Sequence, residues 1–453
     1  MTLTVLFMPE SAYGPTNQCI GLGKVLLDRG HTVVFAAERS WEGRLAPFGF
    51  VEALVDLAPP DPDPAPDAAA GQFWIDFINE TAPEFRKRTI DQLATFIQPT
   101  YQALIDGAKY CEAQLAAIVA DHRPDVLVED NVIAFPALTT ATGAFVRVVS
   151  CNPLEVRGPD VAPPFSGYPA DDRSGWADYL AAFDRAHGEL RADFDAWVRA
   201  QGAAPLPPGE FIHTSAHANL YVYPAELDYT DARPLDASWH RLDSSVRETD
   251  DEYALPAEFA ARDADAALVY LSLGSLGSAD IGLMRRLIDV LGATRHKVIV
   301  SLGPRADELT LPPNMVGAAM LPQTKIIPQV DLVITHGGNN TTTECMHFGK
   351  PMILLPLFWD QYDNAQRVHE RGYGIRLSTY GFADDELPAA VDRLFADGEL
   401  RARAAATGAT IRGRDGLRRG ADVIEKVGLA HAARQRHGAA RPQGAAQRPD
   451  ADG

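Results

Sequence analysis

The sequence predicts an α/β protein built from two doubly wound parallel sheets, and three observations lead to this expectation. First, short apolar runs alternate with helical patterns along both halves of the chain, which is typical of parallel strands buried on both faces. Second, a strand at 4–8, a helix at 19–29 and a strand at 32–36 follow one another as in a βαβ unit. Third, 453 residues is about three times a typical domain length of roughly 150.

The first half of the chain, 1–224, is expected to form one domain. Its strands are predicted at 4–8, 32–36, 124–129, 145–149 and 220–224. Its helices are predicted at 19–29, 80–120 and 174–202. The first of these helices ends at Gly30, a common helix stop. The segment 225–262 is rich in charges, prolines and turn residues, so we expect it to link the two domains.

The second half, 263–428, has the same alternation and is expected to form the second domain. Its strands are predicted at 267–272, 297–301, 332–335 and 352–355. We expect that its last helix can pack back on the first domain. Residues 429–453 are rich in Ala, Arg, Gln and Pro without an apolar period, which predicts a disordered tail. Two such domains face each other across a cleft, where the carboxyl ends of parallel strands bind ligands.

The charge balance limits the partners that this protein is expected to have. Lys+Arg 41 against Asp+Glu 61 gives a net charge of −20, which repels nucleic acid and anionic membranes. Any phosphate must therefore be held locally. The 4 cysteines have no metal-like spacing, so we expect no metal site and a reduced chain. No leader or membrane-spanning run is recognisable, which favours a cytoplasmic location.

The densest functional signal follows the predicted strand at 332–335. Gly337 and Gly338 allow backbone amides to face an anion, and the next helix begins with unpaired N–H groups. His336 can donate a hydrogen bond to a phosphate, and Glu344 can accept two ribose hydroxyls. The alternative is structural: Thr341 and Glu344 have the spacing of a helix capping box.

A second polar group follows the strand at 352–355. Asp360 and Gln361 stand beyond its carboxyl end, where a carboxylate beside an amide suits the vicinal hydroxyls of a sugar. The alternative is that both residues cap a helix below a packed Trp359.

Together these residues resemble the donor signature of family 1 nucleotide-sugar-dependent glycosyltransferases, which have the GT-B fold of two Rossmann-like domains. That signature reads roughly H-x-G-x-(N)-S/T-x-x-E and closes with D/E-Q-x-x-N-A. Further matches are the segments at 29–33 and 273–275 and the segment Leu321-Pro322-Gln323, which corresponds to a V/L-P-Q element. The matching signature positions are His336, Gly338, Asn340, Thr341, Glu344, Asp360, Gln361, Asn364 and Ala365.

The resemblance implies a role for each of these positions. His336, Gly338, Asn340 and Thr341 would hold the phosphates, with Ser275 near the pyrophosphate. Glu344 would hold the ribose. Leu321 and Gln323 belong to the segment whose backbone pairs with the base. Trp359, Asp360 and Gln361 would contact the transferred sugar. Met320 stands where the family often has an aromatic residue that stacks on the base, which leaves the choice of base open.

The sequence departs from the family at the expected general base. The family places a histidine in a G-H-x-x-P-like segment after the first strand, and here that position is Pro15. The carboxylate that would orient the histidine is present as Asp130, next to Glu129. Three explanations stay open: Asp130 or a neighbour such as Glu129 or Asn17 acts as the base, the acceptor is acidic enough to need little help, or transfer activity is lost.

The resemblance implies an inverting, metal-independent transfer from a UDP- or TDP-sugar to a hydroxyl of a hydrophobic natural product, in antibiotic biosynthesis or modification. The nucleotide sugar would be a co-substrate, with no other cofactor. The apolar stretch 73–78 would line an acceptor pocket. The alternatives are a non-catalytic nucleotide-sugar-binding accessory protein, favoured by Pro15, and a GT-B sugar epimerase. A serine hydrolase is disfavoured because no G-x-S-x-G motif is present.

Overall fold

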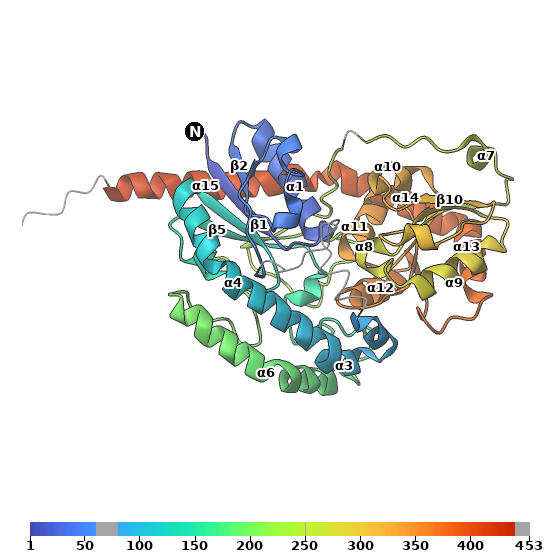
Figure 1. The fold of residues 1–453 in the computed structure, drawn as a ribbon, viewed down its shortest axis with the longest axis horizontal. Coiled ribbons are helices and arrows are strands. Elements are labelled where there is room, and N and C mark those ends of the chain that lie inside the picture. Colours follow the sequence, from blue (N-terminus) through green and yellow to red (C-terminus); the bar gives the residue numbers. More distant parts are fainter. Residues whose placement is uncertain (60–79, 250, 440–453) are drawn as a thin grey trace, which may run out of the picture.

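The computed structural model describes residues 1–59, 80–249 and 251–439, and it has two parallel sheets with helices on their faces (Figure 1). The first sheet has seven strands in the order β3-β2-β1-β4-β5-β6-β7, and the second has six in the order β10-β9-β8-β11-β12-β13. In each sheet the strand order reverses beside the first strand, β1 or β8. This is the doubly wound arrangement that the sequence predicts, and the α/β class is confirmed.

The N-terminal sheet is built from strands that the sequence makes apolar along their length. β1 and β4 pair in register from Val5 and Val126 to Pro9 and Asp130, and the side chains of this stretch are buried. The remaining strands are β2 (Thr32–Phe35), β3 (Val51–Glu52), β5 (Ala144–Val149), β6 (Ala218–Tyr221) and β7 (Trp239–Arg241). The full bounds of the central pair are β1 (Thr4–Pro9) and β4 (Val126–Asp130).

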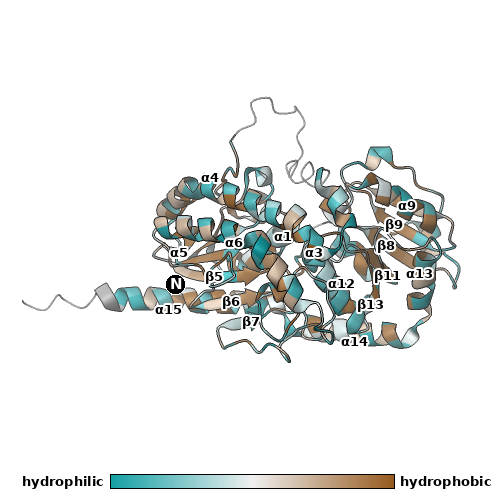
Figure 2. Cartoon of the chain, turned by 90° about the horizontal axis from the view of Figure 1, so that it is seen from below, coloured by the Kyte–Doolittle hydropathy of each residue, from teal (hydrophilic) through white to brown (hydrophobic). Residues whose placement is uncertain are grey.

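Helices cover both faces of this sheet and contribute buried apolar side chains to the core on each face. The hydropathy colours show the strands as largely apolar and the helices as mixed (Figure 2). The main ones are α1 (Tyr13–Asp28), α4 (Gln98–His122) and α6 (Trp176–Ala200). Shorter ones are α3 (Thr89–Gln92) and α5 (Pro136–Thr139). A π-helical turn, Leu93–Ile97, precedes α4 and brings Phe96 to the cleft.

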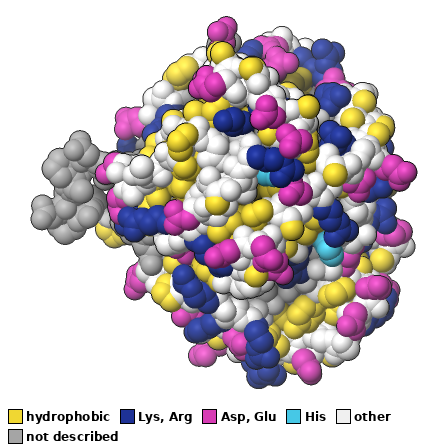
Figure 3. All heavy atoms as spheres, turned by 90° about the vertical axis from the view of Figure 1, so that its right-hand side faces the viewer, with side chains coloured by type: hydrophobic (Ala, Val, Ile, Leu, Met, Phe, Trp, Pro, Cys, Tyr) yellow, Lys and Arg dark blue, Asp and Glu magenta, His cyan; other side chains and the backbone are white. Residues whose placement is uncertain are grey.

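The C-terminal domain repeats this plan around β8 (Leu268–Ser272) and β11 (Leu332–Thr335). Its other strands are β9 (Lys297–Ser301), β10 (Met315–Ala318), β12 (Met352–Leu354) and β13 (Gly374–Arg376). Its helices are α8 (Gly274–Gly277), α9 (Ile281–Gly292), α10 (Gln323–Ile326), α11 (Asn339–Phe348), α12 (Gln361–Glu370), α13 (Glu386–Ala396) and α14 (Gly398–Arg414). On the outer end of this domain, basic and acidic side chains are intermixed (Figure 3).

The helix expected at 80–120 is divided into a 3-10 turn at Ala82–Arg86, α3, the π-helical turn and α4. Three further boundaries differ from the sequence expectation by more than a few residues. α1 begins at Tyr13, six residues before Cys19, because Pro15 lies in the first helical turn, where a missing N–H costs no hydrogen bond. β7 lies inside the expected linker 225–262 but pairs with β6, and its three residues are too few to give a periodic signal. The short helix α7 (Ala257–Ala260) lies in the same segment.

The third difference is the tail, which was expected to begin at 429. The last helix, α15 (Gly416–Ala439), continues through the first part of that segment, and 440–453 lie outside the described residues. Alanine and arginine are strong helix formers, so the segment needs no apolar period of its own to extend a helix that is already packed. Within the described ranges, no helix combines the length and apolar character that a membrane span requires.

α15 returns from the C-terminal domain and lies along the N-terminal one (Figure 1). Arg29, directly after α1, is paired with Asp422 and Glu425, and His431 Nε2 lies 2.7 Å from the Thr142 carbonyl oxygen. Close approach is possible because a glycine begins the helix: a Cβ on Gly416 would lie only 1.8 Å from the Leu242 carbonyl oxygen. The end of the chain is therefore fixed to the first domain.

This close contact gives the first prediction. Gly416→Ala is expected to lower the Tm by about 5 °C, because the added methyl overlaps backbone atoms that cannot move aside cheaply. Gly188→Ala is the matched control, since Gly188 lies inside α6 with nothing within 4 Å of an added Cβ. That change should raise the Tm slightly through helix propensity. Thermal unfolding by circular dichroism tests the pair, and equal shifts would contradict the prediction.

Candidate active site

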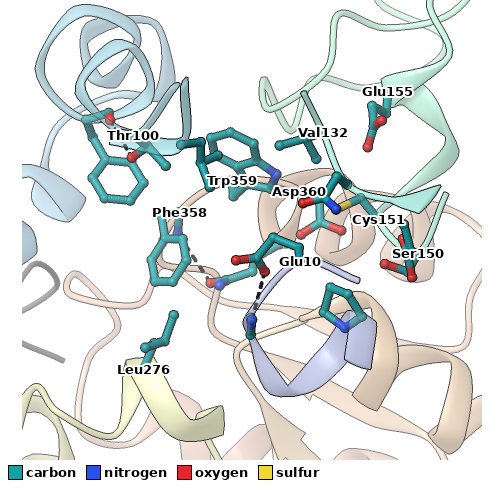
Figure 4. A pocket seen from close by; sticks show the side chains of 17 residues that line it. Glu10, Thr100, Val132, Ser150, Cys151, Glu155, Leu276, Phe358, Trp359 and Asp360 are labelled. Carbon is teal, nitrogen blue, oxygen red and sulfur yellow. Dashed lines mark hydrogen bonds between the residues drawn. The ribbon is translucent and has the colours of Figure 1, made fainter. Parts of the chain in front are cut away.

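A cavity of about 180 Å³ lies between the two domains at the carboxyl ends of the central strands. The first domain contributes the loops after β1, β4 and β5 and the start of α4, and the second contributes the loop between β12 and α12 (Figure 4). Of the expected site residues, Asp130, Trp359, Asp360 and Gln361 line this cavity, as does Pro15. The cavity therefore lies in the interdomain cleft at which the sequence predicts ligand binding.

The predicted phosphate site is built at the N-terminus of α11. Gly337 has φ +86°, a conformation that glycine adopts without strain, and Gly338 is the residue that precedes the helix. The His336 ring is held between two glycines, because a Cβ would lie 2.7 Å from its Cε1 on Gly274 and 2.5 Å from its Nε2 on Gly338. Burial lowers the pKa of His336 to about 4. At neutral pH the ring is therefore uncharged and acts by hydrogen bonding.

This ring position yields a second prediction. Gly338→Ala is expected to weaken nucleoside diphosphate binding by about tenfold, because the new methyl must displace the His336 ring from its place beside the helix tip. Gly398→Ala makes the same change at the start of α14, where nothing lies within 4 Å of an added Cβ, and should leave the affinity unchanged. Calorimetric titration with TDP measures both. Equal affinities for the two variants would show that the ring position is unimportant.

Glu344 lies one turn into α11 and is the centre of a buried polar cluster. Its exposed fraction is 1%, and its two oxygens accept hydrogen bonds from Gln323 Nε2 at 2.6 Å and Asn340 Nδ2 at 3.1 Å. Gln323 Nε2 also lies 3.2 Å from Thr341 Oγ1. Burial raises the pKa of Glu344, and the nearby Arg247, at 3.5 Å, opposes that rise. Four of the expected donor residues are thus in direct contact.

The capping-box alternative for Thr341 and Glu344 is wrong. Gly338 stands at the N-cap, so Thr341 lies inside the helix, and the Glu344 carboxylate is bonded to side chains rather than to the helix start. A carboxylate that is held in place by amides at a helix tip can exchange those bonds for ligand hydroxyls.

Asp360 lies in the cavity wall and connects the two domains. Its Oδ2 accepts hydrogen bonds from the Asn152 backbone N–H at 2.8 Å and from Asn364 Nδ2 at 3.3 Å. It makes no side-chain cap bond to α12, so the simple capping interpretation does not hold for it. Burial raises its pKa to about 7, and the Asn152 bond opposes that rise.

Gln361 and Trp359 have structural contacts as well as a place in the cavity wall. Gln361 Oε1 accepts hydrogen bonds from the Leu357 and Phe358 backbone N–H groups and so fixes the loop. Trp359 has φ +56°, which is strained for a tryptophan, and its ring packs at 4.5 Å from that of Phe165 in the other domain. This packing holds the strained loop against the cleft.

Of the three candidate catalytic residues, one lines the cavity and two do not. Asp130 ends β4 in the wall, is 2% exposed, and burial raises its pKa to about 8. Glu129 is not a lining residue: its Oε1 accepts the Phe135 N–H at 3.1 Å. Asn17 lies in α1 and is not among the lining residues either.

The other expected residues do not line the cavity or fall outside the described structure. Leu321 is half-buried just before α10, and the neighbouring Met320 is 68% exposed. The side chain of Ser275 and the stretch 73–78 fall outside the described residues. Within the described part of the chain, no group of three His, Cys, Asp or Glu side chains could hold a metal ion.

Sequence reasoning missed several residues that complete the site. Asn152 donates from Nδ2 to Asn364 Oδ1 at 2.8 Å, and Asp363 accepts backbone N–H groups of Phe165 and Gly167. These bonds join the domains at the cleft. Arg247 comes from the expected linker, where no pattern connects it with Glu344. Glu10 follows β1 and lines the cavity; its place at the carboxyl end of a predicted strand was the available signal.

Comparisons with known proteins agree with this geometry. Residues 285–412 match the family described as "Erythromycin biosynthesis protein CIII-like, C-terminal domain". The chain is 25% identical over 423 residues to the oleandomycin glycosyltransferase of Streptomyces antibioticus, covering 92% of this chain and 88% of that protein. It is 30% identical over 164 residues to the NDP-glycosyltransferase YjiC of Bacillus subtilis (strain 168), covering 36% of this chain and 42% of that one.

Solved structures share the fold. The glycotransferase of kitacinnamycin superposes with a TM-score of 0.70 at 21% identity, covering 94% of this chain and 99% of that one. The glycosyltransferase VinC in complex with DTDP superposes with a TM-score of 0.61 at 17% identity, covering 94% and 100%. With the glycine-flanked helix tip, the Glu344 cluster and the interdomain cleft, these similarities identify the chain as a glycosyltransferase with the GT-B fold.

Proposed function

We propose that this glycosyltransferase moves a sugar from a UDP- or TDP-sugar to a hydroxyl of a hydrophobic small-molecule natural product, with inversion at the anomeric carbon and without a metal ion. One observation carries the proposal: the Asp360 loop lines the interdomain cavity and is joined by hydrogen bonds to the α11 tip, which leads to the Glu344 cluster. The Asn364 amide joins them, since it donates to the Gly337 carbonyl oxygen at 3.0 Å and to Asp360.

The donor half of the reaction follows from these groups. Charge develops on the diphosphate as its bond to the sugar breaks, and unpaired amides at the α11 tip with the neutral His336 ring can stabilise it. Such fixed dipoles would stabilise the negative charge of the leaving diphosphate, as a metal cation does in other transferases. Glu344 would accept the ribose hydroxyls, and Asp360 with Gln361 would bind the hydroxyls of the sugar.

The acceptor half is apolar enough for a hydrophobic molecule. Phe96, Leu104 and Val132 line the cavity from the first domain, and Leu276 and Phe358 line it from the second. Two related proteins are named for hydrophobic acceptors, the oleandomycin glycosyltransferase and a sterol 3-beta-glucosyltransferase of Pichia angusta. Two structural neighbours were crystallised with thymidine diphosphate, which favours a TDP donor over UDP.

A direct experiment tests the proposal in two stages. Calorimetry with UDP and TDP should show binding, and incubation with TDP- and UDP-sugars plus macrolide, sterol and aromatic acceptors should give a glycoside. Proton NMR of the product should show an inverted anomeric centre, and EDTA should not slow the reaction. Nucleotide binding without transfer to any acceptor would instead support the accessory function that Pro15 suggests.

A further inference from the structure

The β1–α1 loop places a carboxylate in the cavity that the donor signature does not account for. Glu10 directly follows β1, and its backbone N–H donates to the Asp130 carbonyl oxygen at 2.8 Å, which ties the loop to the end of β4. Its side chain is half-buried and lines the cavity, where Figure 4 shows it among Trp359, Asp360 and Cys151. Pro15, one turn further on, lines the same cavity without a polar atom on its side chain.

Two hydrogen bonds hold the Glu10 carboxylate in place. Oε1 accepts the Ser11 hydroxyl at 3.1 Å, and Oε2 accepts the Ala12 backbone N–H at 3.0 Å. Each bond uses one acceptor site of its oxygen, so each oxygen keeps a further lone pair for a proton from a substrate. Both bonds are local to the loop, so the carboxylate keeps its orientation without help from a ligand.

The other groups of the cavity wall are less suited to removing a proton. The described lining residues include no Lys, Arg or His, and the carboxylates among them are the candidate bases: Glu10, Asp130, Glu155 and Asp360. Glu155 is paired with Arg147 at 2.5 Å. Asp360 is bonded to Asn152 and Asn364 and stands on the donor side.

Asp130 differs from Glu10 in exposure and surroundings. It is 2% exposed, and its Oδ2 accepts the Cys19 thiol at 3.7 Å, so little of it faces the open cavity. Burial raises the pKa of both carboxyls, so basicity does not separate them; the greater exposure of Glu10 to the cavity does.

We infer that Glu10 is the general base of the transfer, in the role that Pro15 cannot fill. This inference rests on the proposed function. The acceptor O–H loses its proton to a Glu10 oxygen while the acceptor oxygen forms a bond to the anomeric carbon. The bond from that carbon to the diphosphate oxygen breaks, and its electron pair leaves with the diphosphate. Glu10 then releases the proton to solvent.

The test is Glu10→Gln, assayed with a TDP-sugar and two acceptors of similar shape, an alcohol and a phenol. The local loop should persist, because the Gln oxygen can accept the Ala12 N–H while its amide donates to the Ser11 hydroxyl. We expect kcat to fall by about 100-fold with the alcohol, but by less than about tenfold with the phenol, which ionises more readily. TDP affinity should change less than about twofold. This pattern is not expected from a merely structural residue.

Two further variants sharpen the result. Glu38→Gln removes a carboxylate near Glu10 that does not line the cavity, and should leave kcat within about twofold. Glu10→Asp keeps the charge but withdraws it by one methylene, and should lie between wild type and Glu10→Gln. If wild type transfers sugar and Glu10→Gln matches it, or only Asp130→Asn shows the acceptor-dependent loss, the inference is overturned. If wild type binds TDP but transfers nothing, the proposed function itself fails.

Discussion

Asp360→Ala is expected to lower kcat/KM for glycosyl transfer by about a thousandfold, the largest loss of activity that we expect from one substitution. Two effects combine. The sugar loses charge-assisted hydrogen bonds, each worth roughly 1.5–3 kcal/mol. The two domains also lose a hydrogen bond between them. The Asn152 backbone N–H, 2.8 Å from Asp360 Oδ2, is left buried without this acceptor.

A graded series separates these two effects. Asp360→Asn keeps an oxygen for the Asn152 N–H but loses the charge, so it should fall between wild type and Asp360→Ala. Asp384→Ala, on the same domain and 80% exposed, should leave kcat/KM unchanged. TDP affinity should stay near the wild-type value in all three, since the proposed role of Asp360 is to bind the sugar and not the phosphates. A loss below about tenfold for Asp360→Ala would mean that the carboxylate does not bind the sugar.

The strands were predictable because a parallel strand that is buried on both faces has an unbroken apolar sequence. β1, β4, β8 and β11 all show this pattern and all lie at the centre of a sheet. The edge strands have less to bury: β3 has two residues and β13 has three, and neither was predicted. The tail was misjudged because the apolar contacts of α15, such as Ala421 and Ile424, lie before residue 429. Beyond it, hydrogen bonds of His431 and Gln435 to the Thr142 carbonyl oxygen hold the helix, and these leave no apolar period.

The site residues also fall into two groups: those that are close together in the sequence and those that only the tertiary fold brings together. His336, Gly338 and Glu344 are close in sequence because one strand end and one helix tip form the phosphate site, so a motif could reveal them. Arg247 and Asn152 reach the same region from other segments of the chain, and only the fold brings them to Glu344 and Asp360. Glu10 follows a predicted strand, so its place at the cleft was predictable, but it lies outside the motifs that resemble the family.

The stability of the protein is expected to fall as the pH rises from 6 to 9, with a decrease in Tm of about 15 °C. Burial raises the pKa of both Glu129 and Asp130 to about 8, far above the values of these side chains in an unfolded chain. Between those two values the folded protein holds a proton that the unfolded chain has released. Stability therefore decreases with pH until the folded carboxyls ionise.

The size of this effect follows from the linkage slope of about 1.4 kcal/mol per pH unit for one proton. From pH 6 to 8, each of the two carboxyls contributes a loss of about 3 kcal/mol, and 1 kcal/mol corresponds to roughly 2–4 °C in a domain of this size. A protein whose carboxylates are stabilised by ion pairs would show the opposite slope, gaining stability as the pH rises from acid.

Glu129→Gln is the variant that isolates one of these carboxyls. Glutamine keeps an oxygen for the Phe135 N–H, and Glu129 is fully buried away from the cavity, with no partner for its Oε2 among the described residues. The variant should show a smaller decrease in Tm between pH 6 and 9 than wild type, because Glu129 no longer titrates. Part of the decrease should remain, because burial also raises the pKa of Asp130 and of Asp363 to about 8. Thermal unfolding at intervals of half a pH unit measures the slope. A Tm that is constant or rises over this range in the wild type would show that these buried carboxyls are already ionised at pH 6.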